Sequence, residues 1–397
     1  MQATGTPVLA GVVAAVVGYS SSFVVVLAGL TAVGATPRQA ASGLVALCVA
    51  QALGMLWLAL RHRTPLSLAW STPGAALMVS TGTVTGGWPA AVGAFLVTGV
   101  LVVLTGLVPR LGDLVAAIPV SLARAMLAGV LLPLCVAPAL ALADQPLLVG
   151  PVVLAWLLLV RPAPRWAVPA SLLVALAVVL VEAGDRVSAA DLAPGLTLTA
   201  PAWSASALLG LAVPLYVVTM ASQNVPGVAV MGSYGYRVPW RESMGVTGVG
   251  TLLTAPFGGH AVNLAAITAA LTAGPSAGPD RDRRWLASVS AAVTYLVLAV
   301  AAGALTTLVA AAPDGVMQSA AGLALLGTLA AALGDALTEE RDRLPAAGCL
   351  VVAASGVSVL GVGAAFWALV VGLVLRAVLG AGPTGTRATP SADPART

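Results

Sequence analysis

The stretch LLTAPFGGHAVNLAAITAA, residues 252–270, places two glycines, a histidine and an asparagine inside an otherwise apolar part of the chain. His260 within this stretch is one of only two histidines among 397 residues. In a lipid bilayer, unlike in water, a polar group finds no hydrogen-bond partner outside the protein, so polar residues and helix-breaking glycines are costly there unless the protein supplies the partners. The solvent around this stretch therefore decides how the chain folds.

The composition identifies that solvent as lipid. Hydrophobic residues make up 59% of the chain and charged residues only 8%, and the mean hydropathy is +1.01. Soluble domains carry roughly 25% charged residues, so this chain cannot present a water-facing surface on all sides. We expect an all-α integral membrane protein that lies in the lipid bilayer and has no nucleic-acid partner. The first apolar run lacks a basic leader, which predicts a retained transmembrane segment.

Apolar runs separated by charged residues, prolines and glycines predict fourteen transmembrane segments. Two of these, 66–83 and 257–274, are short and rich in glycine, proline, serine and threonine. The longest polar connection, residues 182–203, follows the seventh segment and divides the chain into seven plus seven. The predicted segments are 8–31, 38–60, 66–83, 88–108, 114–141, 147–160, 166–183, 204–232, 242–256, 257–274, 285–311, 315–334, 345–360 and 361–380.

The arginines support this topology. With the N-terminus inside, fifteen of the 18 basic residues fall on inside loops or the tail, and two fall on outside loops. Such a bias predicts that both termini are cytoplasmic. Arg124 alone lies well inside a predicted segment and away from its ends, and we expect it to have a structural role, reaching the interface or pairing with Asp113 or Asp144.

Seven segments per half mean that the second half enters the membrane from the opposite side, as in the inverted repeats of transporters. Residues 118–132 resemble residues 312–329, and residues 70–80 correspond to residues 254–264. The prolines in STP and TAP predict an extended start, and the following glycines allow close approach. Short broken third and tenth segments would then form two half-helices. Their N-termini would meet in mid-membrane and offer free N–H groups to an anion.

Polar residues near these breaks are the candidates for ligand binding. His260 is also the candidate for proton coupling, because imidazole titrates near cellular pH and no acidic residue falls clearly in mid-membrane. Each candidate has a structural alternative: a neutral histidine bound to a carbonyl, serines bonded back to their own helix, or amides joining helices. The predicted substrate-binding residues are Ser20, Ser21, Ser22, Thr72, Gly74, Ala75, Gln223, Asn224, Phe257, Gly258, Gly259, His260 and Asn263.

Several of these stretches resemble one known family. They are WSTPGAALMVSTG (70–82), GAFLVTGVLVVLTGL (93–107), QNVPGVAVMGSYGYR (223–237), APFGGHAVNLAAITAALTAGPSAGPD (255–280) and GVSVLGVGAAFWALVVGLVL (356–375). Together they resemble the bacterial benzoate/proton symporter (BenE) family over about residues 8–380. The resemblance implies a secondary transporter of the inner membrane that imports benzoate with a proton. It also implies the seven-plus-seven fold of uracil permeases and sulfate-type anion transporters.

The wider fold implies a division of labour between domains. Carried over, residues 8–108 and 204–311 form a core (transport) domain, and residues 114–183 and 315–380 form a gate domain. Residues 184–203 would be the linker outside the membrane, and residues 381–397 a disordered cytoplasmic tail. Members of the fold often dimerise through the gate domain, so a homodimer is expected.

The departures from related families bear on the substrate. Nucleobase members of the fold use glutamates in the eighth and tenth segments, where this chain has Gln223, Asn224 and His260. For an aromatic carboxylate, we expect Phe257 with Tyr19 or Phe23 to line the ring.

Other functions remain open from the sequence alone. They are a transporter or channel for another small anion or a nucleobase and, more remotely, a membrane-embedded enzyme. We expect no enzyme, because no HExxH motif, carboxylate pair or nucleophile–base set is present. We also expect no cofactor and no metal, because the three cysteines have no ligand spacing.

Overall fold

The computed structural model describes residues 5–108, 110–112, 117–183, 195–360 and 362–380. The predicted disordered tail, 381–397, and residues 184–194 of the predicted linker lie outside the described residues. Within the described residues, eight helices are long and apolar enough to cross a membrane. The chain is therefore a mostly helical, multi-pass membrane protein. The number of fourteen segments stays a prediction, because several helices are shorter than a full span.

The first half of the chain forms α1 (Gly5–Ser20), α2 (Phe23–Ala32), α3 (Pro37–His62), β1 (Leu68–Trp70), α4 (Thr72–Thr81), α5 (Gly87–Leu107), α7 (Val120–Asp144), α8 (Pro146–Val160) and α9 (Pro164–Ala183). The second half forms α10 (Ala205–Ala207), η3 (Leu208–Ala212), α11 (Val213–Thr219), η4 (Met220–Asn224), α12 (Val225–Ser233), α13 (Trp240–Thr254), η5 (Ala255–Phe257), β2 (Val262–Leu264), α14 (Ile267–Ala273), α15 (Trp285–Ala311), α16 (Val316–Ala336), α17 (Arg343–Ala354) and α18 (Ala364–Gly380).

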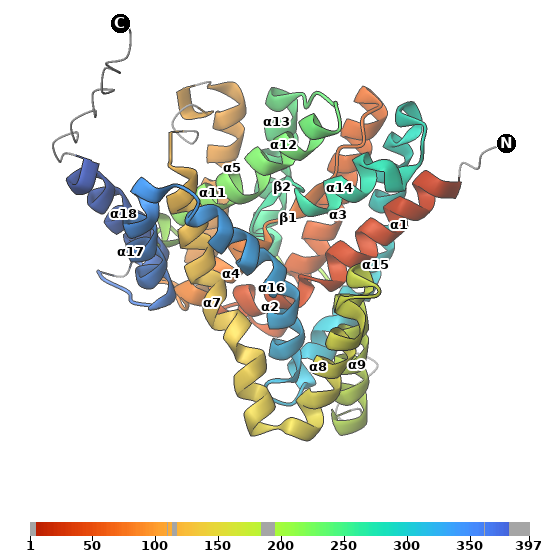
Figure 1. Cartoon of the computed structure of the whole chain (residues 1–397), viewed down its shortest axis with the longest axis horizontal. Coiled ribbons are helices and arrows are strands. Elements are labelled where there is room, and N and C mark those ends of the chain that lie inside the picture. The colour runs from red at the N-terminus through yellow and green to blue at the C-terminus, as the bar shows by residue number, and fades with distance from the viewer. Residues whose placement is uncertain (1–4, 109, 113–116, 184–194, 361, 381–397) are drawn as a thin grey trace, which may run out of the picture.

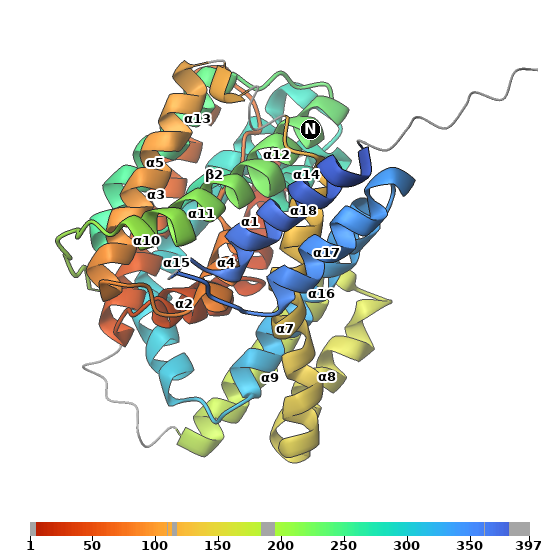
Figure 2. The ribbon, with the colours of Figure 1, turned by 90° about the vertical axis from the view of Figure 1, so that its left-hand side faces the viewer.

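The helices pack as two groups that lie side by side. In one group α3 packs on α15 and α13, and α13 packs on α5; in the other α7 packs on α16 and α17. Figure 2 shows α5 and α13 on one side of the molecule and α7, α8, α16 and α17 on the other. The start of α1 and the end of α18 both lie in the upper half of Figure 1, and α8 and α9 reach its lower end.

Two short strands pair antiparallel in the middle of the bundle (Figure 1). The partners are Leu68 with Leu264, Ala69 with Asn263, and Trp70 with Val262. Two further backbone bonds extend the ladder, from Ser71 N to Ala261 O at 3.0 Å and from Ala265 N to Ser67 O at 2.9 Å. The strands thus supply each other with the partners that lipid cannot give. A helix follows each strand, α4 after β1 and α14 after β2.

The structure corrects the expected start of the second short helix. Residues 257–263 do not begin a helix: Pro256 and Phe257 lie in η5, which continues from the end of α13. Gly258, at φ +96°, turns the chain, and the amide of Gly259 donates to Thr254 O at 2.9 Å. This is a glycine-terminated helix end, so PFGG closes α13 instead of opening the next helix. The expected match of residues 70–80 with 254–264 is accordingly wrong in register, since the strand–helix order recurs at 68–81 and 262–273.

Two other predicted segments are interrupted. The first, 8–31, is broken between Ser20 and Phe23 into α1 and α2. The eighth, 204–232, contains two π-helical turns, η3 and η4, in which Val213 N donates to Leu208 O and Val225 N to Met220 O. Each turn precedes a proline, Pro214 or Pro226. Proline cannot donate a backbone bond, and the widened turn accommodates the interruption.

Helix α3 holds the PFGG turn in place. The hydroxyl of Ser42 donates to the carbonyl of Phe257 at 2.8 Å and accepts from the amide of Thr197 at 2.8 Å. One residue later, a Cβ on Gly43 would lie 2.5 Å from the carbonyl oxygen of Gly258. The turn can approach α3 this closely only because position 43 has no side chain.

We therefore expect Gly43→Ala to destabilise the protein by about 1–3 kcal/mol through overpacking. Alanine has a higher helix propensity than glycine by about 1 kcal/mol, so helix propensity alone predicts that this substitution stabilises the protein. Gly245→Ala in α13 is the control, because its Cβ would meet no atom within 4 Å. The thermal unfolding midpoint of detergent-purified protein should fall for the first variant and stay level or rise for the second. Equal midpoints would contradict the tight contact.

A buried carboxylate ties three helices together beyond the membrane segments. Asp342, between α16 and α17, accepts from the hydroxyl of Ser121 at 2.7 Å and from Nε of Arg376 at 3.0 Å. Burial by itself raises the pKa of Asp342, but these two hydrogen bonds and the arginine charges outweigh it and hold the pKa below its ordinary value. The carboxylate therefore joins the starts of α7 and α17 to α18.

Because the folded state lowers the pKa of Asp342, the ionised group stabilises the fold above the unfolded-state pKa, and this stabilisation is lost as the pH falls. We expect Asp342→Asn to lower stability at neutral pH by about 1–3 kcal/mol. The difference from wild type should shrink as the pH falls below about 4. Unfolding midpoints measured from neutral to acidic pH, with exposed Glu340→Gln as control, check this. A gap that is constant with pH would contradict it.

Candidate substrate site

A cavity of about 410 Å³ lies where the two helix groups meet the strand pair. This volume is within the range of about 300–1,000 Å³ that holds small ligands. The α1–α2 break, the starts of α4 and α14, and η4 line one side of the cavity together with Tyr295 of α15, and α7 and α16 line the opposite side. Its polar and aromatic lining residues are Ser21, Ser22, Trp70, Thr72, Arg124, Ser222, Gln223, Thr268, Tyr295 and Thr328.

The start of α4 is capped from within the protein. The Ser71 hydroxyl accepts from the amide of Gly74 at 3.1 Å, and it also accepts from the hydroxyl of Thr219 at 2.8 Å. Pro73 has no N–H to offer. Thr72, the first residue of α4, lines the cavity. Gly74 lies behind it, where a Cβ would come within 2.3 Å of Leu215.

Aromatic side chains line one side of the cavity. Trp70 at the end of β1 packs edge-on against Tyr295 of α15, with ring centroids 6.0 Å apart, and edge-on against Tyr19 at 5.5 Å. The indole N–H of Trp70 donates to the Ser22 hydroxyl at 2.9 Å. Phe23 stacks on Tyr19 at 5.2 Å from the far side. Trp70 and Tyr295 line the cavity, and Tyr19 and Phe23 support them from behind.

The serines at the α1–α2 break bond back to their own helix, as the structural alternative predicted. Ser20 donates to Val17 O at 3.3 Å, and Ser21 and Ser22 both donate to Gly18 O, at 3.1 Å and 2.9 Å. Their hydroxyl oxygens keep acceptor capacity, which Trp70 uses at Ser22. Ser21 and Ser22 line the cavity.

The adjacent side-chain amides of Gln223 and Asn224 in η4 face different parts of the protein. Gln223 lines the cavity. Asn224 is buried, and its Oδ1 accepts from the amide of Leu264 in β2 at 2.8 Å. The widened turn thus carries one amide to the cavity and uses the next to hold the end of a strand.

His260 lies behind the strand pair and outside the cavity lining. Its Nε2 is 2.9 Å from the carbonyl of Ser71, and because a carbonyl only accepts, Nε2 carries the hydrogen. Nδ1 is buried without a partner among the described residues, and Phe95 packs edge-on against the ring at 6.4 Å. The histidine therefore holds the residue that caps α4.

The structure brings four of the predicted substrate residues to the cavity wall: Ser21, Ser22, Thr72 and Gln223. Asn263 is buried in β2, where its Nδ2 donates to Leu264 O at 2.8 Å. The predicted residues outside the lining are Ser20, Gly74, Ala75, Asn224, Phe257, Gly258, Gly259, His260 and Asn263.

Sequence reasoning missed Trp70 and Tyr295, and it assigned Arg124 a structural role. A tryptophan directly before STP and a tyrosine inside a long apolar run were the available signals. The acidic group near Arg124 is Asp335 of α16, whose Oδ2 lies 3.3 Å from Nε of Arg124, and not the expected Asp144. Asp144 ends α7, twenty positions from Arg124, and Asp113 lies outside the described residues.

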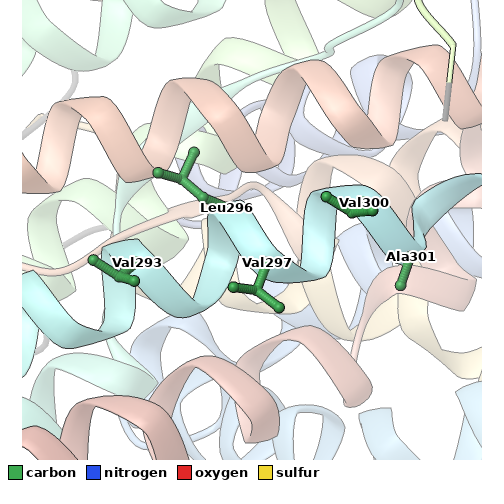
Figure 3. A pocket seen from close by; sticks show the side chains of 5 residues that line it. All are labelled: Val293, Leu296, Val297, Val300 and Ala301. Carbon is green, nitrogen blue, oxygen red and sulfur yellow. The ribbon is translucent and has the colours of Figure 1, made fainter.

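A second hollow lies on the outer face of α15, and Figure 3 shows the five side chains that line it. All are apolar, and Val297 and Val300 are 66% and 64% exposed. They form a stripe along one helix with no polar group to orient a ligand. Such a surface suits contact with lipid.

Solved structures share the fold. The transmembrane domain of a cyanobacterium bicarbonate transporter, BicA, matches with a TM-score of 0.57 at 16% identity, covering 95% of this chain and 97% of that one. The murine Solute Carrier 26 family member A9 anion transporter, in the inward-facing state, matches with a TM-score of 0.60 at 13% identity, covering 96% of this chain and 68% of that one. At such identities the likeness concerns the fold alone.

Sequence comparisons identify the family. The inner membrane protein YdcO of Escherichia coli K12 is 40% identical over 372 residues, 94% of this chain and 95% of that protein. A benzoate membrane transport protein of Acinetobacter baylyi is 28% identical over 377 residues, with 94% of each chain covered. The BenE family profile, described as "Benzoate membrane transport protein", matches residues 2–378. The chain therefore belongs to the BenE family of benzoate membrane transport proteins.

Proposed function

We propose that this protein imports an aromatic carboxylate, benzoate, together with a proton. The observation that carries the proposal is the cavity between the two helix groups. It combines an aromatic side, from Trp70 and Tyr295, with polar side chains at Thr72 and Gln223. A ring packed on the aromatic side places its carboxylate toward these polar side chains, which is how a small, mostly apolar site fixes orientation.

Transport follows from the position of this cavity. Its walls belong to the predicted core domain, 8–108 and 204–311, and to the predicted gate domain, 114–183 and 315–380. Movement of one group of helices against the other would expose the cavity to each side of the membrane in turn. The strand pair and both helices that follow it belong to the core, so the core half of the site moves as a unit.

A symported proton makes import of an anion favourable. An inside-negative potential opposes the entry of an anion by about 2.3 kcal/mol per charge per 100 mV. One proton carried with benzoate cancels this term and adds the pH gradient. The arginine distribution supports an inner-membrane location with both termini cytoplasmic. We also propose a homodimer through the gate domain.

His260 was the proton candidate from sequence. Its hydrogen bond to Ser71 favours a different role, because Ser71 caps α4 at the cavity. We propose that His260 is a positioning residue that holds this cap, and that the proton is not carried on its imidazole.

The substrate is tested by uptake into proteoliposomes. Radiolabelled benzoate should accumulate when the lumen is alkaline, and a protonophore should abolish the accumulation. Bicarbonate and uracil should neither accumulate nor compete. Because BicA and this chain share a fold, bicarbonate uptake without benzoate uptake would replace the proposed substrate with a small inorganic anion. Current without a proton requirement would instead indicate a channel.

Two substitutions separate the roles of His260. Gln places an N–H donor near the position of Nε2 but cannot titrate, whereas Ala removes the donor. We expect His260→Gln to keep most of the uptake and its pH dependence, and His260→Ala to lose roughly tenfold because a hydrogen bond at a buried site is lost. Uptake by the Gln variant that no longer depends on pH would return the proton to His260. Size-exclusion profiles of both variants control for folding.

A further inference from the structure

Arg124 is the one charged residue among the described residues that line the cavity. It lies in the second turn of α7, and only 19% of its side chain is exposed. A guanidinium has five N–H donors and is costly to bury without acceptors. The partners of Arg124 therefore bear on what the cavity is built to hold.

Those partners are few. Nε lies 3.3 Å from Oδ2 of Asp335, yet Nε is buried without a hydrogen bond, and no nitrogen of Arg124 makes one with the described residues. Other arginines differ: Arg284 donates to the carbonyls of Gly278 and Ala273 at 2.8 Å and 2.7 Å, and Arg376 donates to Asp342 at 3.0 Å. Arg124 thus has unused donors at the cavity wall.

Asp335 stands outside the cavity as a loosely held counter-ion. Its side chain is 53% exposed, and it lines the neighbouring recess together with Arg341 and Arg376. On α16 the cavity-lining residues Ala324, Thr328 and Ala331 form one stripe along the helix. Asp335 continues this stripe by one turn. A carboxylate in the cavity and the carboxylate of Asp335 would therefore approach Arg124 from adjoining positions.

We infer that Arg124 binds the carboxylate of the transported anion and that Asp335 competes with the anion for the same guanidinium. The inference rests on the proposed function, since it names the residue that recognises the charge of that substrate. Arginine suits this role because its planar fork matches a carboxylate in two parallel hydrogen bonds. In the absence of substrate Asp335 neutralises Arg124, and an arriving anion takes its place.

Binding of radiolabelled benzoate to detergent-purified protein tests this, because competition predicts opposite signs for the two partners. Arg124→Gln should weaken binding roughly tenfold or more, the scale of a charge-assisted hydrogen bond. Asp335→Asn should tighten binding several-fold, since it removes the competing carboxylate. The double variant should bind as weakly as Arg124→Gln alone. Arg124→Lys, which keeps the charge and loses the fork, should fall between Gln and wild type.

A salt bridge that only supports the fold gives a different pattern: both single variants weaken binding, and the double variant recovers it. That pattern would overturn the inference. Glu340→Gln is the matched control, because it removes one negative charge from an exposed pair near the same end of α16 and should leave binding unchanged. If Glu340→Gln tightened benzoate binding as much as Asp335→Asn, the effect of Asp335 would be explained by the change in net charge alone, and the inference would also be overturned.

Competition between benzoate and its neutral analogue benzamide gives a second readout, because a loss of folded protein would not change the preference for one ligand over the other. In wild type, benzoate should outcompete benzamide by a wide margin, and in Arg124→Gln the margin should nearly vanish. Wild-type protein that binds no benzoate would overturn the proposed substrate. Normal wild-type binding with Asp335→Asn unchanged or weaker would overturn the role of Arg124 alone.

Discussion

Backbone pairing in the middle of the bundle is the constraint on which the site depends. A membrane protein can interrupt a helix only where the freed backbone groups find partners inside the protein. Here β1 and β2 provide those partners for each other, and the ladder continues through Ser71 and Ala265. The side chains of Ser71, Asn224 and His260 then secure both ends. The interruption places polar side chains at membrane depth while the two strands pair each other's backbone groups.

Some of the polar residues around the strand pair line the cavity, and others form hydrogen bonds that fix the surrounding backbone. Thr72 and Gln223 line the cavity, while their neighbours Ser71 and Asn224 bond to the protein. At each of these two places one residue lines the cavity and its neighbour in the chain holds the backbone, so the site needs few polar side chains. The charge on the opposite wall, Arg124, comes from the other helix group. A site assembled from two groups in this way is complete only while they lie together, which is consistent with the proposed alternating access.

Much of this arrangement followed from the sequence, and the errors have definite causes. Composition indicated the membrane class, and STP marked the change from an extended segment to a helix, because proline disfavours helix in the residue before it. PFGG misled, because a proline–glycine pair reads the same whether it ends one helix or begins another; only the pairing of residues 262–264 with 68–70 distinguishes them. Arg124 and Asp335 are 211 positions apart, and no local pattern links two residues on separate helices.

The π-helical turn η4 has a consequence for how the cavity wall is joined to the strand pair. An ordinary turn would rotate Asn224 about 100° from Gln223 and then continue the same face four residues on. The extra residue in η4 widens the helix at one point. There Gln223 lines the cavity, and the side chain of Asn224 accepts a hydrogen bond from the β2 amide of Leu264. The residue that lines the cavity and the residue that fixes the end of β2 are therefore consecutive in the chain, so the position of Gln223 is tied to that of the strand.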